Sequence, residues 1–133
     1  MGKYEKYIIR DPLSIVEPKF HHGATLNEFM SATLLPESKV TVHMYWRTEK
    51  TELSEKLTRT VTLPHTHDVD QVQIAIGEKD ASEMEVVLGD ETYKVRCPYA
   101  VYIPAGLSHT IVSHKILKPP VANATLILKG TYE

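Results

Sequence analysis

The chain has 133 residues, of which 42% are hydrophobic and 24% are charged, a balance typical of one soluble globular domain. Its formal net charge of −2, with the histidines counted as neutral, gives no basis for binding nucleic acid or an anionic membrane surface. The single cysteine excludes an internal disulfide, and the N-terminal residues lack the apolar run of a signal peptide, so we expect a cytoplasmic protein.

The first 39 residues are predicted to form an N-terminal extension of a single domain that spans residues 1–133. Within this extension, GATLNEFMSATLL (Gly23–Leu35) places Leu26, Phe29 and Met30 at helical spacing and contains few helix breakers, which predicts a short helix. The earlier stretch EKYIIR (Glu5–Arg10) is apolar enough to form a strand. The main barrel is then expected to begin at residue 40.

From residue 40 to residue 130, apolar and polar side chains mostly alternate, as they do along β-strands. Each run is short and bounded by Gly, Pro, Asp or Asn, and Gly89–Asp90 is typical of a tight hairpin turn. Thr48–Lys56 is predicted to be a solvated loop or a hairpin tip, and His114–Asn123 a loop between strands. The pattern predicts an all-β barrel or sandwich with strands in Val40–Thr48, Lys56–Leu63, Gln71–Ile76, Glu83–Val95 (a hairpin), Tyr99–Pro104, His109–Ser113 and Ala124–Gly130.

One of these strands is preceded by an unusually polar stretch, LPHTHDVDQVQIAIGE (Leu63–Glu78), with two histidines one residue apart. Side chains alternate between the faces of a strand, so His65, His67, Gln71 and Gln73 share one face if the register is kept. Two imidazoles at positions i and i+2 stand close enough to bind one ion, and neutral imidazole is the commonest protein ligand for first-row metals. An exposed polar strand face is the alternative interpretation.

A second stretch, YIPAGLSHTIV (Tyr102–Val112), contains a histidine in the order P-x-G-x-x-H. Pro104 and Gly106 favour a turn out of one strand, and His109 opens the next strand. Because the turn sets the direction of that imidazole, a third histidine can reach the point at which the first two meet.

Together these two stretches resemble the two motifs of the cupin family, H-x-H with a further polar ligand and then, after hairpin strands, P-x-G-x-x-H. The resemblance covers roughly residues 40–128 and implies a double-stranded β-helix, or jelly-roll barrel, with a metal inside it. The family's ligands are usually three histidines and one glutamate. Carried over to this sequence, the ligands are His65, His67 and His109, with Gln71 at the position of the glutamate.

The glutamine changes the charge of the implied site. A carboxylate would cancel one unit of the ion's charge, whereas an amide oxygen cancels none, so the ion would be a stronger Lewis acid and would attract an anionic substrate. Three or four protein ligands also leave positions open for a substrate. Asp70 is the rival fourth ligand; its place in the alternation puts it on the opposite face from Gln71, and a bulge would exchange the two.

Candidates for substrate binding come from the strand VTVHMYWRT, in which His43, Tyr45 and Arg47 share one face. On an inner face, Arg47 would bind a carboxylate or phosphate and Tyr45 would donate a proton. The apolar residues Met44 and Trp46 favour the opposite orientation, in which they fill the core and the polar set faces outward.

Two further candidates lie on neighbouring strands. Gln73 shares the face of the histidine pair. Tyr99 and Tyr102 lie on opposite faces of one strand close to the second motif, so only one of them can face the site, and Tyr102 is the candidate for substrate contact.

These features predict a metal-dependent enzyme that acts on a small, anionic organic molecule with one divalent transition metal, Fe, Mn, Ni, Co or Zn. Two chemistries fit the site: isomerase- or lyase-type Lewis-acid chemistry, which the uncancelled charge favours, and a dioxygenase reaction. Small cupins with three histidines and a glutamine are similar to uronate-processing sugar enzymes. The alternative is a non-catalytic module that binds a metal or a small ligand. The resemblance also implies a homodimer.

Overall fold

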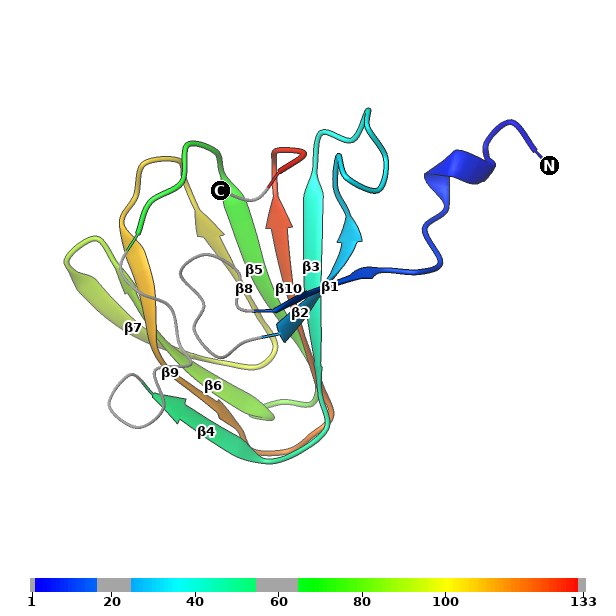
Figure 1. The fold of residues 1–133 in the computed structure, drawn as a ribbon. Coiled ribbons are helices and arrows are strands. Elements are labelled where there is room, and N and C mark those ends of the chain that lie inside the picture. Colours follow the sequence, from blue (N-terminus) through cyan, green and yellow to red (C-terminus); the bar gives the residue numbers. More distant parts are fainter. Residues whose placement is uncertain (1, 17–24, 55–64, 132–133) are drawn as a thin grey trace.

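The computed structural model describes residues 2–16, 25–54 and 65–131, and it consists almost entirely of β-strands (Figure 1). In these ranges the one helical element is a 3-10 turn, η1 (Glu5–Tyr7). Nothing helical in the described ranges has the length and apolar character that a membrane crossing needs. The strands are β1 (Leu13–Val16), β2 (Thr25–Met30), β3 (Thr41–Arg47), β4 (Thr51–Ser54), β5 (Gln71–Ile76), β6 (Ser82–Leu88), β7 (Glu91–Arg96), β8 (Tyr99–Ile103), β9 (His109–Ile116) and β10 (Val121–Ile127).

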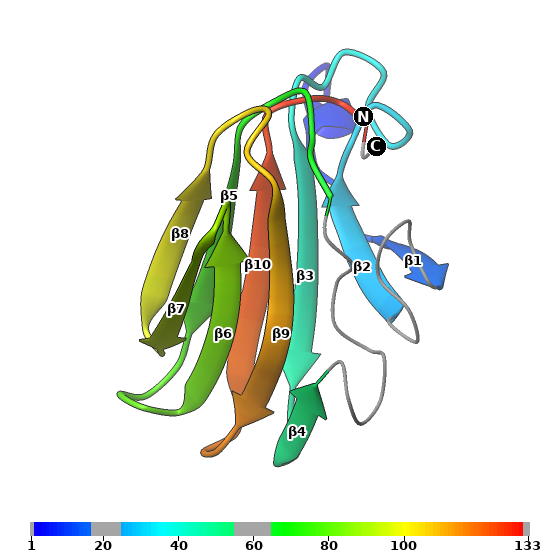
Figure 2. The same ribbon diagram turned by 90° about the vertical axis from the view of Figure 1, so that its left-hand side faces the viewer.

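The strands form two antiparallel sheets that face each other (Figures 1 and 2). One sheet has six strands in the order β1-β2-β3-β10-β5-β8, and the other has four in the order β4-β9-β6-β7. In Figure 2 the four-stranded sheet lies in front of the six-stranded one. Because β10 pairs between β3 and β5, strands that are distant in the sequence line one shared interior.

The register of the six-stranded sheet places its inward-facing side chains in rows across the strands. One row crosses the sheet near the start of β5, and all its members are buried: Thr41, Ile127, Gln71 and Ile103. A second row lies four residues further along β5 and consists of Tyr45, Asn123, Ala75 and Tyr99. These two rows mark the two ends of the interior.

The interior is only partly an apolar core. A compact apolar cluster of Ala75, Ala81, Cys97, Ile116 and Val121, with Tyr99 packed against it, fills the end that lies beside the second row. Elsewhere the described buried residues include more polar than apolar side chains, among them five histidines and two glutamates. Buried polar groups need partners, so the interior is built for polar contacts.

The helix expected in Gly23–Leu35 is wrong: Thr25–Met30 forms strand β2 and pairs with β3. The pattern is misleading because a glutamate of this strand, Glu28, is buried, while its apolar neighbour Phe29 is 37% exposed. A polar inward residue hides the period of two on which strand prediction depends.

Three loop and strand boundaries also differ from the predictions. The segment predicted as loop or hairpin tip contains strand β4, and β9 continues past Ser113 to Ile116, so only a short turn precedes β10. Glu5–Arg10 forms no strand, since its first residues make the turn η1. The hairpin around Gly89–Asp90 is confirmed as β6–β7. The strand predicted at Lys56–Leu63 lies outside the described residues.

Candidate metal centre

The first two candidate ligands, His65 and His67, lie just before β5 and are both buried. His65 forms an isolated antiparallel bridge with His109, in which each backbone N–H donates to the other residue's carbonyl oxygen, at 3.1 and 3.0 Å. This bridge brings the start of the first motif against the start of β9. The alternation places both imidazoles inward, on the face that β5 continues with Gln71 and Ala75.

The turn that carries His109 is tied to the first motif through its backbone. Gly106 has a φ of +82°, a conformation that favours glycine, and its N–H donates to the carbonyl oxygen of His67 at 2.8 Å. Leu107 N–H donates to the oxygen of Pro104 at 3.2 Å and closes the turn. The P-x-G segment therefore fixes the position of His109 relative to His67.

The three imidazoles meet at one point in the interior. Their ligand atoms all lie within 4.8 Å of one another. The ring centroids are 4.3 Å apart for His65 and His109, 4.8 Å for His65 and His67, and 5.4 Å for His67 and His109. Since metal–nitrogen bonds are about 2 Å long, side-chain adjustments of about an ångström bring all three nitrogens onto one cation. The donor set therefore fits a divalent transition metal.

The backbone sets the tautomer of His109. Its Nδ1 lies 3.0 Å from the carbonyl oxygen of Leu107, so Nδ1 carries the proton and donates, and Nε2 keeps a lone pair that points into the cluster. Burial lowers the pKa of His109, and the nearby His67 lowers it further, against the opposing effect of the bond to Leu107. The imidazole is thus held in the neutral form that binds metal.

Gln71, at the start of β5, stands beside this cluster. It is 2% exposed, and its Nε2 donates to Nε2 of His109 at 3.0 Å. A half-turn of the amide about its last side-chain bond exchanges nitrogen for oxygen, so the same side chain can present an oxygen to a cation beside His109.

Asp70, the rival fourth ligand, is directed elsewhere. One of its oxygens accepts a hydrogen bond from the Tyr102 hydroxyl, and the other accepts from the backbone N–H of Ala105 at 2.8 Å. The bond from Tyr102, followed by the one from Ala105, lowers the pKa of Asp70. Its carboxylate therefore holds the loop that leads to His109 and is not a member of the cluster.

No family model matches the sequence, and no curated protein matches it. Solved structures do match the fold. The chain is similar to Bacillus subtilis oxalate decarboxylase, a protein with Mn(II) centres, with a TM-score of 0.56 and 14% identity over 95% of this chain and 29% of that one. It is also similar to KdgF from Halomonas sp., with a TM-score of 0.51 and 13% identity over 90% of this chain and 89% of that one.

The chain has the cupin fold. It spans less than a third of the oxalate decarboxylase chain that it matches. In this structure the two-sheet architecture and the buried histidine cluster occur together, as the resemblance of the two sequence motifs implies.

The residues named as substrate-binding candidates divide between the two faces. His43, Tyr45, Arg47 and Gln73 all belong to the inward-facing rows of the six-stranded sheet. The expectation that Met44 and Trp46 fill the core is wrong, because Trp46 is 58% exposed whereas His43 is 2% exposed. Strand β3 turns its apolar side chains outward because the interior beside it holds polar groups.

Tyr102 is not brought to the cluster. It alternates with the buried Ile103 along β8, is 55% exposed and bonds Asp70 on the outside of the sheet. Its neighbour Tyr99 is the tyrosine of this strand that faces inward, where its hydroxyl contacts the sulfur of Met84 at 3.5 Å. The expected contact between Tyr102 and a substrate is therefore not supported by its position.

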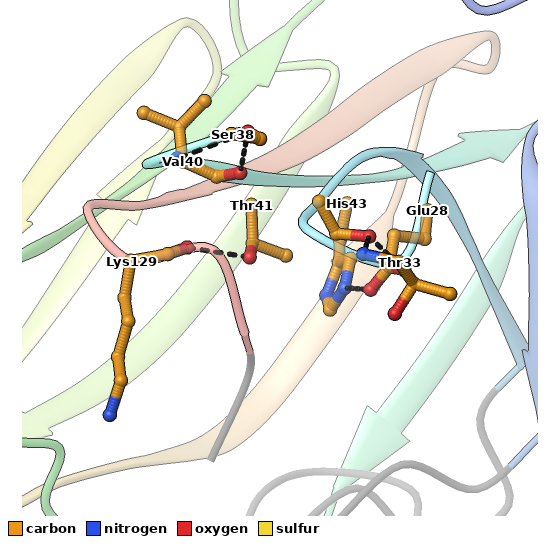
Figure 3. Close-up of polar contacts among 8 residues, drawn as sticks. Glu28, Thr33, Ser38, Val40, Thr41, His43 and Lys129 are labelled. Atoms are coloured by element: carbon orange, nitrogen blue, oxygen red, sulfur yellow. Dashed lines mark hydrogen bonds and ion pairs between the residues drawn. The ribbon is translucent and has the colours of Figure 1, made fainter. Parts of the chain in front are cut away.

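A buried polar chain that links β2 to β3 was missed in the sequence. Nε2 of His43 lies 2.9 Å from Oε1 of Glu28 (Figure 3). The Ser31 hydroxyl donates to Oε2 of Glu28 at 2.7 Å. Glu28 lies in the segment that was expected to be helical, so its inward direction was hidden. At the start of β3, the Thr41 hydroxyl donates to the Lys129 carbonyl oxygen at 2.7 Å and closes the sheet at the metal end (Figure 3).

Proposed function

We propose that this cupin is a metal-dependent enzyme that acts on a small, anionic organic molecule. The supporting observation is the convergence of three buried imidazoles, His65, His67 and His109, from two separated parts of the chain. When bound, a divalent Fe, Mn, Ni, Co or Zn ion would supply uncancelled positive charge at one end of the interior. The match to a decarboxylase with Mn(II) centres is in keeping with a metal and an acid substrate.

The residues around the cluster favour Lewis-acid chemistry over redox chemistry. Among the described residues the cluster holds no carboxylate, and Gln71 contributes a neutral amide. Such a donor set leaves the charge of the ion available to polarise a carbonyl or enediol oxygen. We therefore propose isomerase- or lyase-type chemistry first and a dioxygenase reaction second.

Two phenols of the interior hold their protons. Burial raises the pKa of both Tyr45 and Tyr99, so each phenol stays protonated at neutral pH, although the positive charge of Arg47 acts against this shift. Tyr45 faces inward on β3 and Tyr99 on β8, both in the row at the end of the interior away from the histidine cluster. We therefore propose them as hydrogen-bond donors to the part of the substrate that lies away from the metal, and not as the groups that exchange protons at the metal.

A non-catalytic binding module is the second candidate, and the replacement of the family's glutamate by Gln71 favours it. Metal analysis of the purified protein, followed by assays of candidate substrates with and without oxygen, distinguishes these functions. Turnover without oxygen supports the isomerase or lyase, and oxygen uptake with turnover supports the dioxygenase. Tight binding of a ligand without turnover would leave the module.

The ligand set is tested by substitution. We expect His65→Ala to reduce the bound metal from about one ion per chain to near zero, whereas Gln73→Ala, on the same face but outside the cluster, keeps it. Unchanged metal content in His65→Ala would show that the ligand assignment is wrong. Gln71→Ala is expected to weaken metal binding about tenfold or more and Asp70→Ala to leave it unchanged, and the reverse result would make Asp70 the fourth ligand.

A further inference from the structure

At the other end of the interior from the histidine cluster lies a cationic side chain without an acidic partner. Arg47 is the last residue of β3 and faces inward, across the sheet from Val121. Its guanidinium carbon lies 4.4 Å from the centre of the Tyr45 ring, so the side chain folds back over the inner face. No carboxylate of the described ranges forms an ion pair with it, although arginine stays charged in proteins.

The groups that surround Arg47 are neutral and polar. Tyr45 and Tyr99 stand in one row with Asn123, and the tyrosines keep their protons. His114 reaches the same place from the opposite sheet, next to Met84, which contacts the Tyr99 hydroxyl. The side of Arg47 that faces the interior thus meets hydrogen-bonding groups and no counter-charge.

Several of these groups have buried polar atoms with no hydrogen-bond partner in the described protein. They are Nε of Arg47, Nε2 of His114 and Oδ1 of Asn123. His114 itself is 8% exposed. Unpaired buried polar atoms are unfavourable and rare in folded proteins. Two of them beside a guanidinium whose own Nε is unpaired indicate a place that a polar ligand completes.

We propose that Arg47, with His114, binds the carboxylate at the far end of the substrate, and that Oδ1 of Asn123 accepts from a hydroxyl group of the same molecule. A carboxylate fits better than a phosphate because the guanidinium supplies one positive charge and its neighbours are neutral. The inference that this carboxylate belongs to the substrate rests on the proposed function, because it takes the histidine cluster to bind the other end of the same molecule.

The register gives the length of such a molecule. Gln71 lies beside the histidine cluster, and Ala75, in the row over which Arg47 folds, is four residues further along β5. At the rise of a strand this separation is about 13 Å. Allowing about 2 Å for a metal–oxygen bond and about 3 Å for a hydrogen bond leaves roughly 8 Å between the two oxygen-bearing ends. The substrate class is therefore an acid with donor oxygens at one end and a distal carboxylate, longer than a two-carbon diacid.

The first test uses metal-free protein, so its result does not depend on metal binding or turnover. In protein with ¹⁵N-labelled arginine, we expect glutarate to shift the Nε–H resonance of Arg47 in a saturable way, and phosphate to do so more weakly. Sodium chloride at the same ionic strength serves as the control. Absence of a saturable shift at tens of millimolar glutarate, or stronger binding of phosphate, would overturn the assignment of a carboxylate site.

The second test asks whether one molecule reaches both ends. Diacids of two to eight carbons are titrated into Mn(II)-loaded protein, and we expect affinity to be greatest at an intermediate length. Arg47→Gln should weaken the best diacid at least about tenfold but leave oxalate, which is too short to reach Arg47, nearly unchanged. Arg96→Gln, at an arginine paired with Glu83 on the outer face, is the matched control.

Folding of the variants is checked by their metal content and circular dichroism. If Arg47→Gln does not fold, Arg47→Lys replaces it, since lysine keeps the charge and loses the paired donors of the guanidinium. A dependence on chain length that survives unchanged in the Arg47 variant would overturn the proposal. If wild-type protein binds glutarate in the first test but turns over no compound in the assays of candidate substrates, the result would count against the proposed enzymatic function and not against the carboxylate site.

Discussion

The environment of His114 predicts a dependence of stability on pH. Burial, together with the positive charge of Arg47, lowers the pKa of His114 from 6.5 to about 4 in the folded protein. Between these two pH values the unfolded chain binds a proton at this residue and the folded chain does not, so the free energy of unfolding falls as the pH falls. At about 1.4 kcal/mol per pKa unit, the loss amounts to about 3 kcal/mol between pH 7 and pH 4.

The measurement compares two pH profiles. Urea unfolding of metal-free wild-type protein and of His114→Gln is followed from pH 7.5 to pH 4. The other histidines and the carboxylates titrate in both proteins, so they largely cancel in the difference. We expect the unfolding free energy of the wild type, minus that of the variant, to fall by about 3 kcal/mol as the pH is lowered, with most of the change below pH 6.5.

Loss of packing alone would give a different result. Replacing a buried imidazole changes stability at every pH by the same amount if the residue is neutral in both states. Two parallel profiles, separated by a constant difference, would therefore refute the argument that His114 is held uncharged in the interior.

Three further predictions test the buried chain, the turn and the outer sheet face. Glu28→Ala should lower the free energy of unfolding by at least about 2 kcal/mol, because the carboxylate accepts from two buried side chains; a loss below about 0.5 kcal/mol in urea unfolding would contradict this. Gly106→Ala should cost about 1 kcal/mol and weaken metal binding, since its φ of +82° is strained for alanine and the turn positions His109; unaltered metal affinity by calorimetry would count against that coupling. The outer face around Trp46 and Ile76 is apolar, so we expect a homodimer through this face, which light scattering detects and Trp46→Glu dissociates; a monomeric wild type would rule it out. Tyr93→Ser, at an exposed tyrosine of the other sheet, is the control for the last experiment.

The inward faces of the cluster residues could be predicted from the sequence because their determinants are local, whereas the meeting of His109 with His65 and His67 was implied by the resemblance to the two cupin motifs. Side-chain alternation places His65, His67 and Gln71 on one face, and the P-x-G turn directs His109. Each of these relations depends on residues within a few positions of one another. The hairpin around Gly89–Asp90 was predictable for the same reason.

The faces of β2 and β3 that point into the interior could not be predicted, because the rule that apolar residues face inward fails on these two strands. Glu28 is buried because His43, which is far from it in the sequence, stands beside it on the neighbouring strand. Burying a carboxylate without a hydrogen-bond partner costs much free energy, so the sequence alone predicts that Glu28 faces the solvent. The exposure of Trp46 follows from the same pairing.

The sequence by itself therefore determined the all-β class, the hairpin and the inward faces of the residues in the histidine cluster. Only the tertiary structure decided which face of β3 turns inward and that Arg47, Tyr99, His114 and Asn123 gather at the other end of the interior. Those four residues lie on β3, β8, β9 and β10, and their meeting depends on strand pairings over long sequence separations. Local alternation sets the face of each residue relative to its own strand, whereas the register between distant strands sets its neighbours.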